Sequence, residues 1–75
     1  MNNAQTAQII KSKLKSKNIS ISKMLENCLI NKSLIYDLEK RDRTPSAEVL
    51  YKIADYLDVS VDYLLGRTDK PEVNK

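Results

Sequence analysis

Apolar side chains recur along the chain at intervals of three or four residues, which is the spacing of one face of an α-helix. The clearest such stripe consists of Leu50, Ile53, Ala54 and Leu57. Similar stripes predict five helices, over about residues 5–17, 21–28, 32–40, 45–57 and 61–65. Because only a few residues separate these segments, the pattern predicts an all-α, compact five-helix fold in which short helices cross at steep angles.

Residues at the predicted boundaries support these limits. Ser20, Asn31 and Ser60 can each cap a helix, because a short polar side chain accepts a hydrogen bond from a backbone amide of the first turn. Pro45 suits the first position of a helix, where its missing N–H group would have had no partner. Gly66 can end the last helix, since glycine adopts the left-handed conformation without a steric penalty.

The 75 residues are enough for one domain. We expect this domain over residues 1–69 and a flexible C-terminal tail over residues 70–75, because the last residues are polar and include Pro71. One Gly and two Pro are too few for the many tight turns of a strand-rich domain, which also favours helices.

Composition narrows the possible functions. The chain has no His and one cysteine, Cys28, so we expect no disulfide, no metal site and no cofactor. It also lacks a glycine-rich phosphate loop and a nucleophile beside a base, so we do not expect an enzyme. Cys28 is instead expected to be a small buried apolar residue.

The sequence also lacks the segments that direct a chain to a membrane. No apolar run approaches the roughly 20 residues of a membrane span. The first residues do not have the basic and then apolar pattern of a secretory signal. We therefore expect a cytoplasmic protein without membrane contact.

The net charge of +3 is distributed unevenly. Residues 1–43 hold nine basic and four acidic side chains, whereas residues 44–75 hold four basic and six acidic ones. A basic half of this kind favours contact with a polyanion such as nucleic acid. A lysine-rich helix that is merely exposed to solvent explains the charge equally well, so charge alone does not decide between the two.

The predicted helix over residues 32–40 has two opposed faces. Its apolar side consists of Leu34, Ile35 and Leu38. At about 100° per residue, its polar side consists of Lys32, Ser33, Tyr36, Asp37 and Lys40. These polar side chains end in groups that can bond to base edges in a DNA major groove. The alternative is an ordinary exposed surface with local side-chain pairs.

Two further observations favour DNA over an ordinary surface. Lys32 in the first turn of the predicted helix would oppose the helix dipole, so helix stability does not explain it. A basic cluster directly after the helix, where DNA phosphates would run, consists of Lys40, Arg41 and Arg43.

Three segments of the chain resemble a known family. Residues 22–39, SKMLENCLINKSLIYDLE, look like the helix-turn-helix of the phage-repressor-like (Cro-like, xenobiotic-response-element) DNA-binding family. The similarity continues through TPSAEVL at residues 44–50 and is strongest in KIADYLDVSVDYLLGRT at residues 52–68. It covers about residues 7–69, which is nearly the whole chain.

The resemblance implies a lambda-repressor-like fold whose third helix is the recognition helix. It implies base contacts by Lys32, Ser33, Tyr36 and Asp37. It implies phosphate contacts by Ser22, Lys23, Asn31, Lys40, Arg41 and Arg43.

The chain departs from the family pattern in three places. Leu29 stands where the family usually has Gly between the second and third helices, so we expect either that Asn27 takes the strained turn or that the second helix ends differently. Leu14 replaces an Arg that often pairs with the acid at Glu39, which needs another partner or stays hydrated. Arg41 and the following Asp replace the usual Gly after the third helix.

The resemblance therefore implies a transcriptional regulator, of the repressor type found in phages and mobile elements, that binds a double-stranded DNA operator. One recognition helix reads only a few base pairs, so we expect a homodimer on DNA with half-sites about one helical turn apart. The alternative is a protein-interaction module on the same fold, an antitoxin or an anti-repressor partner, which uses its C-terminal Tyr and Leu surface. A separate protein regulator would be a further partner.

Overall fold

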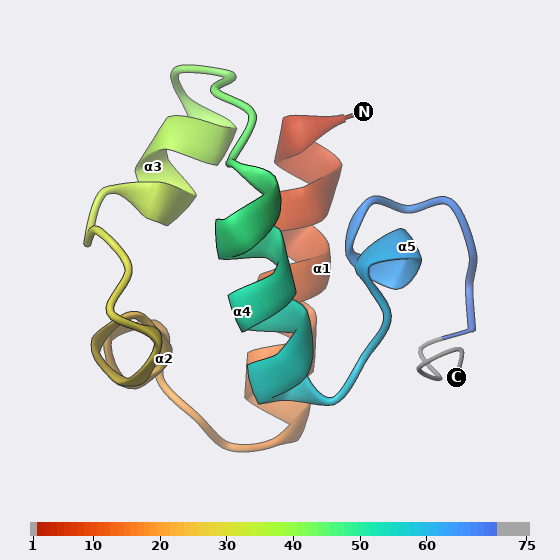
Figure 1. The fold of residues 1–75 in the computed structure, drawn as a ribbon, viewed down its shortest axis with the longest axis horizontal. Coiled ribbons are helices and arrows are strands. Elements are labelled where there is room, and N and C mark those ends of the chain that lie inside the picture. Colours follow the sequence, from red (N-terminus) through yellow and green to blue (C-terminus); the bar gives the residue numbers. More distant parts are fainter. Residues whose placement is uncertain (1, 71–75) are drawn as a thin grey trace.

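The computed structural model describes residues 2–70, which form five α-helices joined by short loops (Figure 1). The helices are α1 (Asn3–Ser16), α2 (Ile21–Cys28), α3 (Leu34–Glu39), α4 (Ala47–Leu57) and α5 (Val61–Leu64). The predicted all-α five-helix fold is thus confirmed over these residues. Most of the predicted C-terminal tail, residues 71–75, lies outside the described residues.

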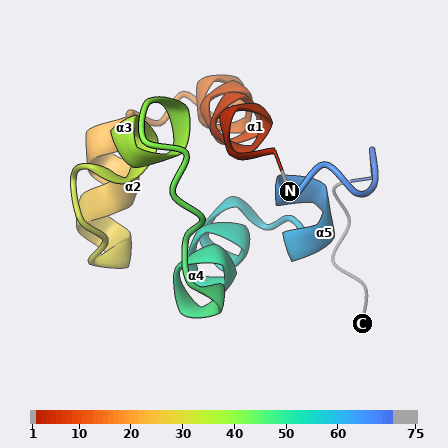
Figure 2. The ribbon, with the colours of Figure 1, turned by 90° about the horizontal axis from the view of Figure 1, so that it is seen from above.

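Helices α1 and α4 form the middle of the molecule, with α2 and α3 on one side and α5 on the other (Figure 1 and Figure 2). Helix α1 packs against α3 and α5, while α4 packs against α2 and α5. The pair α2 and α3 therefore occupies one end of the fold, and none of the helices in residues 2–70 covers its outer surface.

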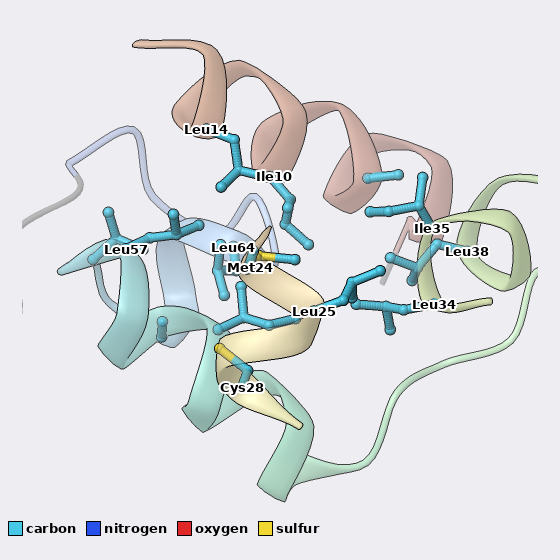
Figure 3. Packing of buried hydrophobic residues seen from close by; sticks show 14 residues of the cluster. Ile10, Leu14, Met24, Leu25, Cys28, Leu34, Ile35, Leu38, Leu57 and Leu64 are labelled. Atoms are coloured by element: carbon cyan, nitrogen blue, oxygen red, sulfur yellow. The ribbon is translucent and has the colours of Figure 1, made fainter. Parts of the chain in front are cut away.

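One buried apolar cluster holds the five helices together (Figure 3). Ile10 of α1, Met24 of α2, Leu38 of α3, Leu57 of α4 and Leu64 of α5 all lie within it, and each is at most 1% exposed. Burial of an aliphatic side chain of this size stabilises the fold by about 1.5–3 kcal/mol relative to exposure. The stripe that predicts the fourth helix is buried at all four positions, which confirms that interpretation.

Serine side chains cap the N-termini of three helices. Ser20 accepts a hydrogen bond from the Lys23 amide, and Ser60 accepts one from the Tyr63 amide, so these two predicted caps are confirmed. The predicted start of α4 at Pro45 is wrong by two residues. Ser46 caps that helix by accepting from the Val49 amide, and this bond leaves the proline outside.

The predicted start of α3 is also too early. The helix begins at Leu34, and Ser33 precedes it without a capping bond from its side chain. The side-chain oxygen of Asn31 accepts a bond from the Ser33 amide two residues later, so Asn31 forms a turn instead of capping the helix. Lys32 therefore lies in this turn and not in the first helical turn.

Four of the helices end in the same way, with a residue in the left-handed conformation. These residues are Asn18, Leu29, Asp58 and Gly66. After each, the next amide bonds back to a carbonyl five residues earlier, as in Ile30 N to Leu25 O at 2.9 Å. Asn, Asp and Gly tolerate this conformation, whereas Leu adopts it only at a steric cost of about 1–2 kcal/mol. The expected alternatives for the α2–α3 turn are therefore corrected, since Leu29 itself adopts it, with φ 56° and ψ 45°.

We predict that Leu29→Gly stabilises the protein by about 1 kcal/mol, because it removes the left-handed strain of a Leu backbone. Little burial is lost, since the Leu29 side chain is 86% exposed. Urea denaturation at an unchanged m-value measures the difference. Leu29→Ala is the matched control, because it removes the same exposed side chain and keeps the strain. Equal stability of the two variants would contradict the prediction.

Cys28 is buried at the end of α2, as the sequence predicts, and its Sγ lies 3.8 Å from the carbonyl oxygen of Lys52. Burial raises the pKa of the Cys28 thiol, an effect opposed by the nearby Lys52 charge. The raised pKa keeps the native thiol protonated to higher pH than in the unfolded chain.

We predict that iodoacetamide alkylates Cys28 far more slowly in the native protein than in urea, and that the native rate rises only at higher pH. Equal rates in both states would disprove this.

Candidate nucleic-acid interface

The outer face of α3 presents most of the residues predicted to read bases. Leu34, Ile35 and Leu38 are buried against the core, and this packing turns the opposite side of the helix outward. Tyr36 is 54% exposed on that side. Asp37 shares the polar side with Tyr36, while Lys32 and Ser33 lie in the turn immediately before the helix. The four predicted base-reading residues therefore form one continuous surface at the end of the fold.

Side chains on this surface are linked by hydrogen bonds. The Ser33 hydroxyl lies 2.9 Å from Asn31 Oδ1 and 3.0 Å from Asp37 Oδ2. Since a hydroxyl has one proton, it donates to one of these acceptors at a time. The Asn31 oxygen also accepts from the Ser33 amide at 2.9 Å, which leaves the NH₂ group of Asn31 directed away from this network as a donor. An amide donor at this point suits a phosphate oxygen.

Arg41 joins the same network from the C-terminal side of α3. Its Nη1 lies 3.3 Å from Asp37 Oδ1, one helical turn earlier. Its guanidinium carbon lies 5.3 Å from the centre of the Tyr36 ring, within the range of a cation–π contact. Arg41 is therefore both a predicted phosphate contact and a direct neighbour of two predicted base-reading residues.

The other predicted phosphate contacts are exposed around this surface, and within residues 2–70 their side chains form no hydrogen bond with it. Ser22 and Lys23 lie in the first turn of α2, and Lys40 and Arg43 lie just after α3. Within residues 2–70, Lys23, Lys40 and Arg43 form no ion pair, and neither does Lys32. Their ammonium and guanidinium groups are therefore available to an anionic ligand.

The loop after α3 is fixed by bonds from two directions. The Arg43 amide donates to the Asp37 carbonyl at 3.0 Å, which closes the end of α3. From α1, the buried Asn3 side chain donates to Asp42 Oδ1 at 3.0 Å and lies 3.3 Å from Thr44 Oγ1. Asp42 also supplies the left-handed residue, with φ 51°, where the family usually has Gly. No sequence pattern pointed to Asn3, because its partners lie about 40 residues away.

Helix α3 is also tied to α1 by an ion pair. Lys11 Nζ lies 2.7 Å from Glu39 Oε2, so the acid that lost its usual Arg partner to Leu14 has another one. Lys11 lies three residues before Leu14 and hence on the same side of α1. The three-residue spacing between Lys11 and Leu14 was the sequence signal that could have identified Lys11 as the partner. It places a long basic side chain one helical turn from the position of the missing Arg.

Acidic side chains gather on the other helices. Glu48 and Asp55 of α4, Asp58 after it, and Asp62 of α5 are all exposed. The ion pairs there are long, at 3.7 Å for Lys52–Glu48 and 3.8 Å for Arg67–Asp62. The acidic excess of residues 44–75 thus lies on α4, α5 and the loop between them, whereas Lys32, Lys40, Arg41 and Arg43 lie before and after α3. These cations can attract an anionic ligand to that end of the protein.

The site therefore combines a protruding helix with hydrogen-bonding tips and a surrounding set of cations. Comparison with known proteins gives this arrangement a family, since the family model described as Helix-turn-helix matches residues 10–64. The chain belongs to this helix-turn-helix family. It is the Cro-like family that the sequence resembles, and the matched range contains every residue predicted to contact DNA.

Two curated relatives carry names of the same helix-turn-helix type. The HTH-type transcriptional regulator SinR of Bacillus licheniformis is 38% identical over 66 residues, which are 87% of this chain and 60% of the relative. An HTH-type transcriptional regulatory protein of Methanococcus vannielii is 38% identical over 52 residues, which are 69% of this chain and 16% of the relative. The chain thus spans less than two thirds of either relative. No solved structure gives a significant match. Among residues 2–70, no helix has both the length and the apolar character needed to cross a membrane.

We predict a small coupling energy between Lys11 and Glu39, below about 1 kcal/mol, because both side chains are partly exposed. A double-mutant cycle with Lys11→Met and Glu39→Gln, followed by urea denaturation, measures it. The coupling should fall as salt is added. The longer Lys52–Glu48 pair is the matched control and should give a smaller value; a larger value there would contradict the prediction.

Proposed function

We propose that this helix-turn-helix protein is a sequence-specific, double-stranded DNA-binding transcriptional regulator without enzymatic activity. The observation that carries the proposal is the surface made by α3 and the turn before it, where Lys32, Ser33, Tyr36 and Asp37 lie together. Beside it lie Lys40 and Arg43, which form no ion pair within residues 2–70. Its family membership and the names of its relatives support the same function.

In this proposal α3 enters the major groove of B-DNA. Lys32 donates to the acceptors of guanine, Ser33 donates or accepts, and Asp37 accepts from an exocyclic amino group. The Tyr36 ring contributes apolar contact and its hydroxyl a further bond. Positioning on the backbone comes from phosphate contacts by Ser22, Lys23, Asn31, Lys40, Arg41 and Arg43.

We further propose that the protein binds its operator as a homodimer. A helix as short as α3, with six residues, covers few base pairs, so two copies on related half-sites are needed for high specificity. The surface away from α3 offers room for a second copy. Tyr51 is 65% exposed beside a hollow of about 490 Å³, which Val61 and Leu65 also line. Repression is the simplest output, because a bound dimer blocks other proteins from the same DNA. Such a protein acts in the cytoplasm of a cell that carries the phage or mobile element.

We predict that selection from random duplexes at near-physiological salt enriches a two-fold-symmetric site bound about 10³-fold or more tightly than bulk DNA. The physical reason is that base contacts add to the phosphate contacts only at a matching sequence. Titration of the enriched site measures the ratio. Salt-sensitive binding to every duplex alike, with no enriched sequence, would contradict the proposal and point to a protein ligand.

We predict different effects from the two groups of residues. Lys32→Ala and Asp37→Ala should change which base is preferred at particular positions, by about 1–3 kcal/mol in discrimination. Lys40→Ala and Arg43→Ala should weaken binding to all duplexes alike and reduce the salt slope by about one unit each. Affinities for the selected site and for its single-base variants distinguish these outcomes. Equal effects from both groups would overturn α3 as the reading helix.

A further inference from the structure

We propose that Arg41 is a positioning residue for base reading, which holds the Asp37 carboxylate so that it accepts a hydrogen bond from the N4 amino group of a cytosine. This inference rests on the proposed DNA-binding function and deepens it. It assigns Arg41 a role in specificity, in addition to the phosphate contact that the family resemblance implies.

The contacts of the Asp37 carboxylate carry the inference. Oδ1 lies 3.3 Å from Arg41 Nη1, and Oδ2 lies 3.0 Å from the Ser33 hydroxyl. Arg41 thus bonds to one oxygen, and the Ser33 hydroxyl, whose single proton can also go to Asn31 Oδ1, can bond to the other. These contacts restrict the rotation of the carboxylate and occupy at most two of its about four acceptor sites. The remaining sites of Asp37 can accept a hydrogen bond from DNA, and carboxylates in the major groove accept from the N4 amino group of cytosine.

Arg41 is itself fixed by the Tyr36 ring. The guanidinium carbon lies 5.3 Å from the ring centre, while the same group bonds to Asp37. The Asp37 side chain is 18% exposed and that of Arg41 57% exposed, so Arg41 lies on the outer side of the pair. A guanidinium has five N–H donors, and within residues 2–70 only one of them is bonded. The others can bond to a phosphate while Asp37 stays in place.

The charge of Arg41 also helps the carboxylate to enter the groove. The DNA phosphates repel Asp37 whatever the base pair, and an adjacent cation offsets that repulsion equally on every duplex. The orientation that Arg41 imposes on Asp37 matters only where the base pair offers a donor, so loss of Arg41 should weaken that duplex more than the duplex that does not. A cation that contacts only phosphates has no such preference.

Arg43 provides a matched control in the same loop. It has the same side chain, it is exposed, and within residues 2–70 it makes no ion pair. Its contact with DNA should be with phosphate alone. Any effect that follows from the loss of one positive charge near the backbone should be shared by Arg41→Ala and Arg43→Ala.

The experiment uses the full chain and the duplex obtained by selection. The base pair read by Asp37 is first identified as the one whose preference is lost in Asp37→Ala. Dissociation constants are then measured on the selected duplex and on the duplex with that pair substituted, for the wild type, Arg41→Ala, Arg43→Ala, and the Arg41→Ala, Asp37→Ala double variant. The ratio of the two constants is the discrimination at that base pair.

We expect Arg41→Ala to reduce this discrimination about tenfold, which is within the range for one good side-chain contact to a base. Arg43→Ala should weaken both duplexes equally and leave the ratio unchanged. In the double variant the ratio should equal that of Asp37→Ala alone, because Arg41 acts through Asp37. Arg41→Gln, which is uncharged and can still donate to Asp37, should keep more of the discrimination than Arg41→Ala. Unchanged thermal unfolding shows that the variants fold.

Two results would overturn the inference at different levels. If Arg41→Ala weakens both duplexes by the same factor as Arg43→Ala, Arg41 is a phosphate contact only, and the proposed function stands. If no duplex is enriched by the wild type, the proposed function fails and this inference fails with it.

Discussion

Helix α3 exists because the rest of the protein buries one side of it. Six residues are too few for an isolated helix in water, since the first turn must be ordered before the backbone bonds can offset its entropy. Leu34, Ile35 and Leu38 supply the compensation by burial against α1 and the core, and the Lys11–Glu39 ion pair adds a second tie to α1. The same packing turns the polar side of α3 outward. The candidate interface is thus a product of core packing.

The outward surface is already organised without a ligand. The Ser33 hydroxyl bonds to Asn31 or to Asp37, and Arg41 bonds to Asp37, so these side chains have fewer rotamers left to order on binding. A preorganised surface loses less conformational entropy when it meets its partner. Lys23 and Lys40 at the margin are different, since their long side chains are exposed and form no ion pair within residues 2–70. Such groups add long-range attraction and little geometric selectivity.

Sequence patterns predicted the parts of this fold that depend on neighbours along the chain. The buried stripe of α4 and the caps Ser20 and Ser60 are local features, and they agree with the structure. Errors arose where two local signals competed. At α4 both Pro45 and Ser46 suit a helix start, and the hydrogen bond made by the serine decides between them. At Leu29 the residue type argued against a left-handed turn, but the continuing chain and the buried helices on both sides impose it.

The candidate site was predictable as a set of residues but not as a network. Spacing alone puts Ser33, Asp37 and Arg41 on successive turns, yet which of them bond depends on rotamers that only packing fixes. The contacts of Lys11 and Asn3 with the α3 region were even harder to predict from the sequence. They depend on how α1 crosses α3, and no pattern within either segment encodes that crossing.

The bond between Asn3 and the loop after α3 has a consequence for the order in which the protein assembles and loosens. Its partners are 39 and 41 residues apart in sequence, so it closes only after the intervening helices have met. The buried Oδ1 of Asn3 has no hydrogen-bond partner within residues 2–70, which makes the closed arrangement less favourable than a fully bonded one. The loop that carries Arg41 and Arg43 should accordingly order only after the helices have met. Amide exchange there should proceed by local opening, well below the free energy needed to unfold the core.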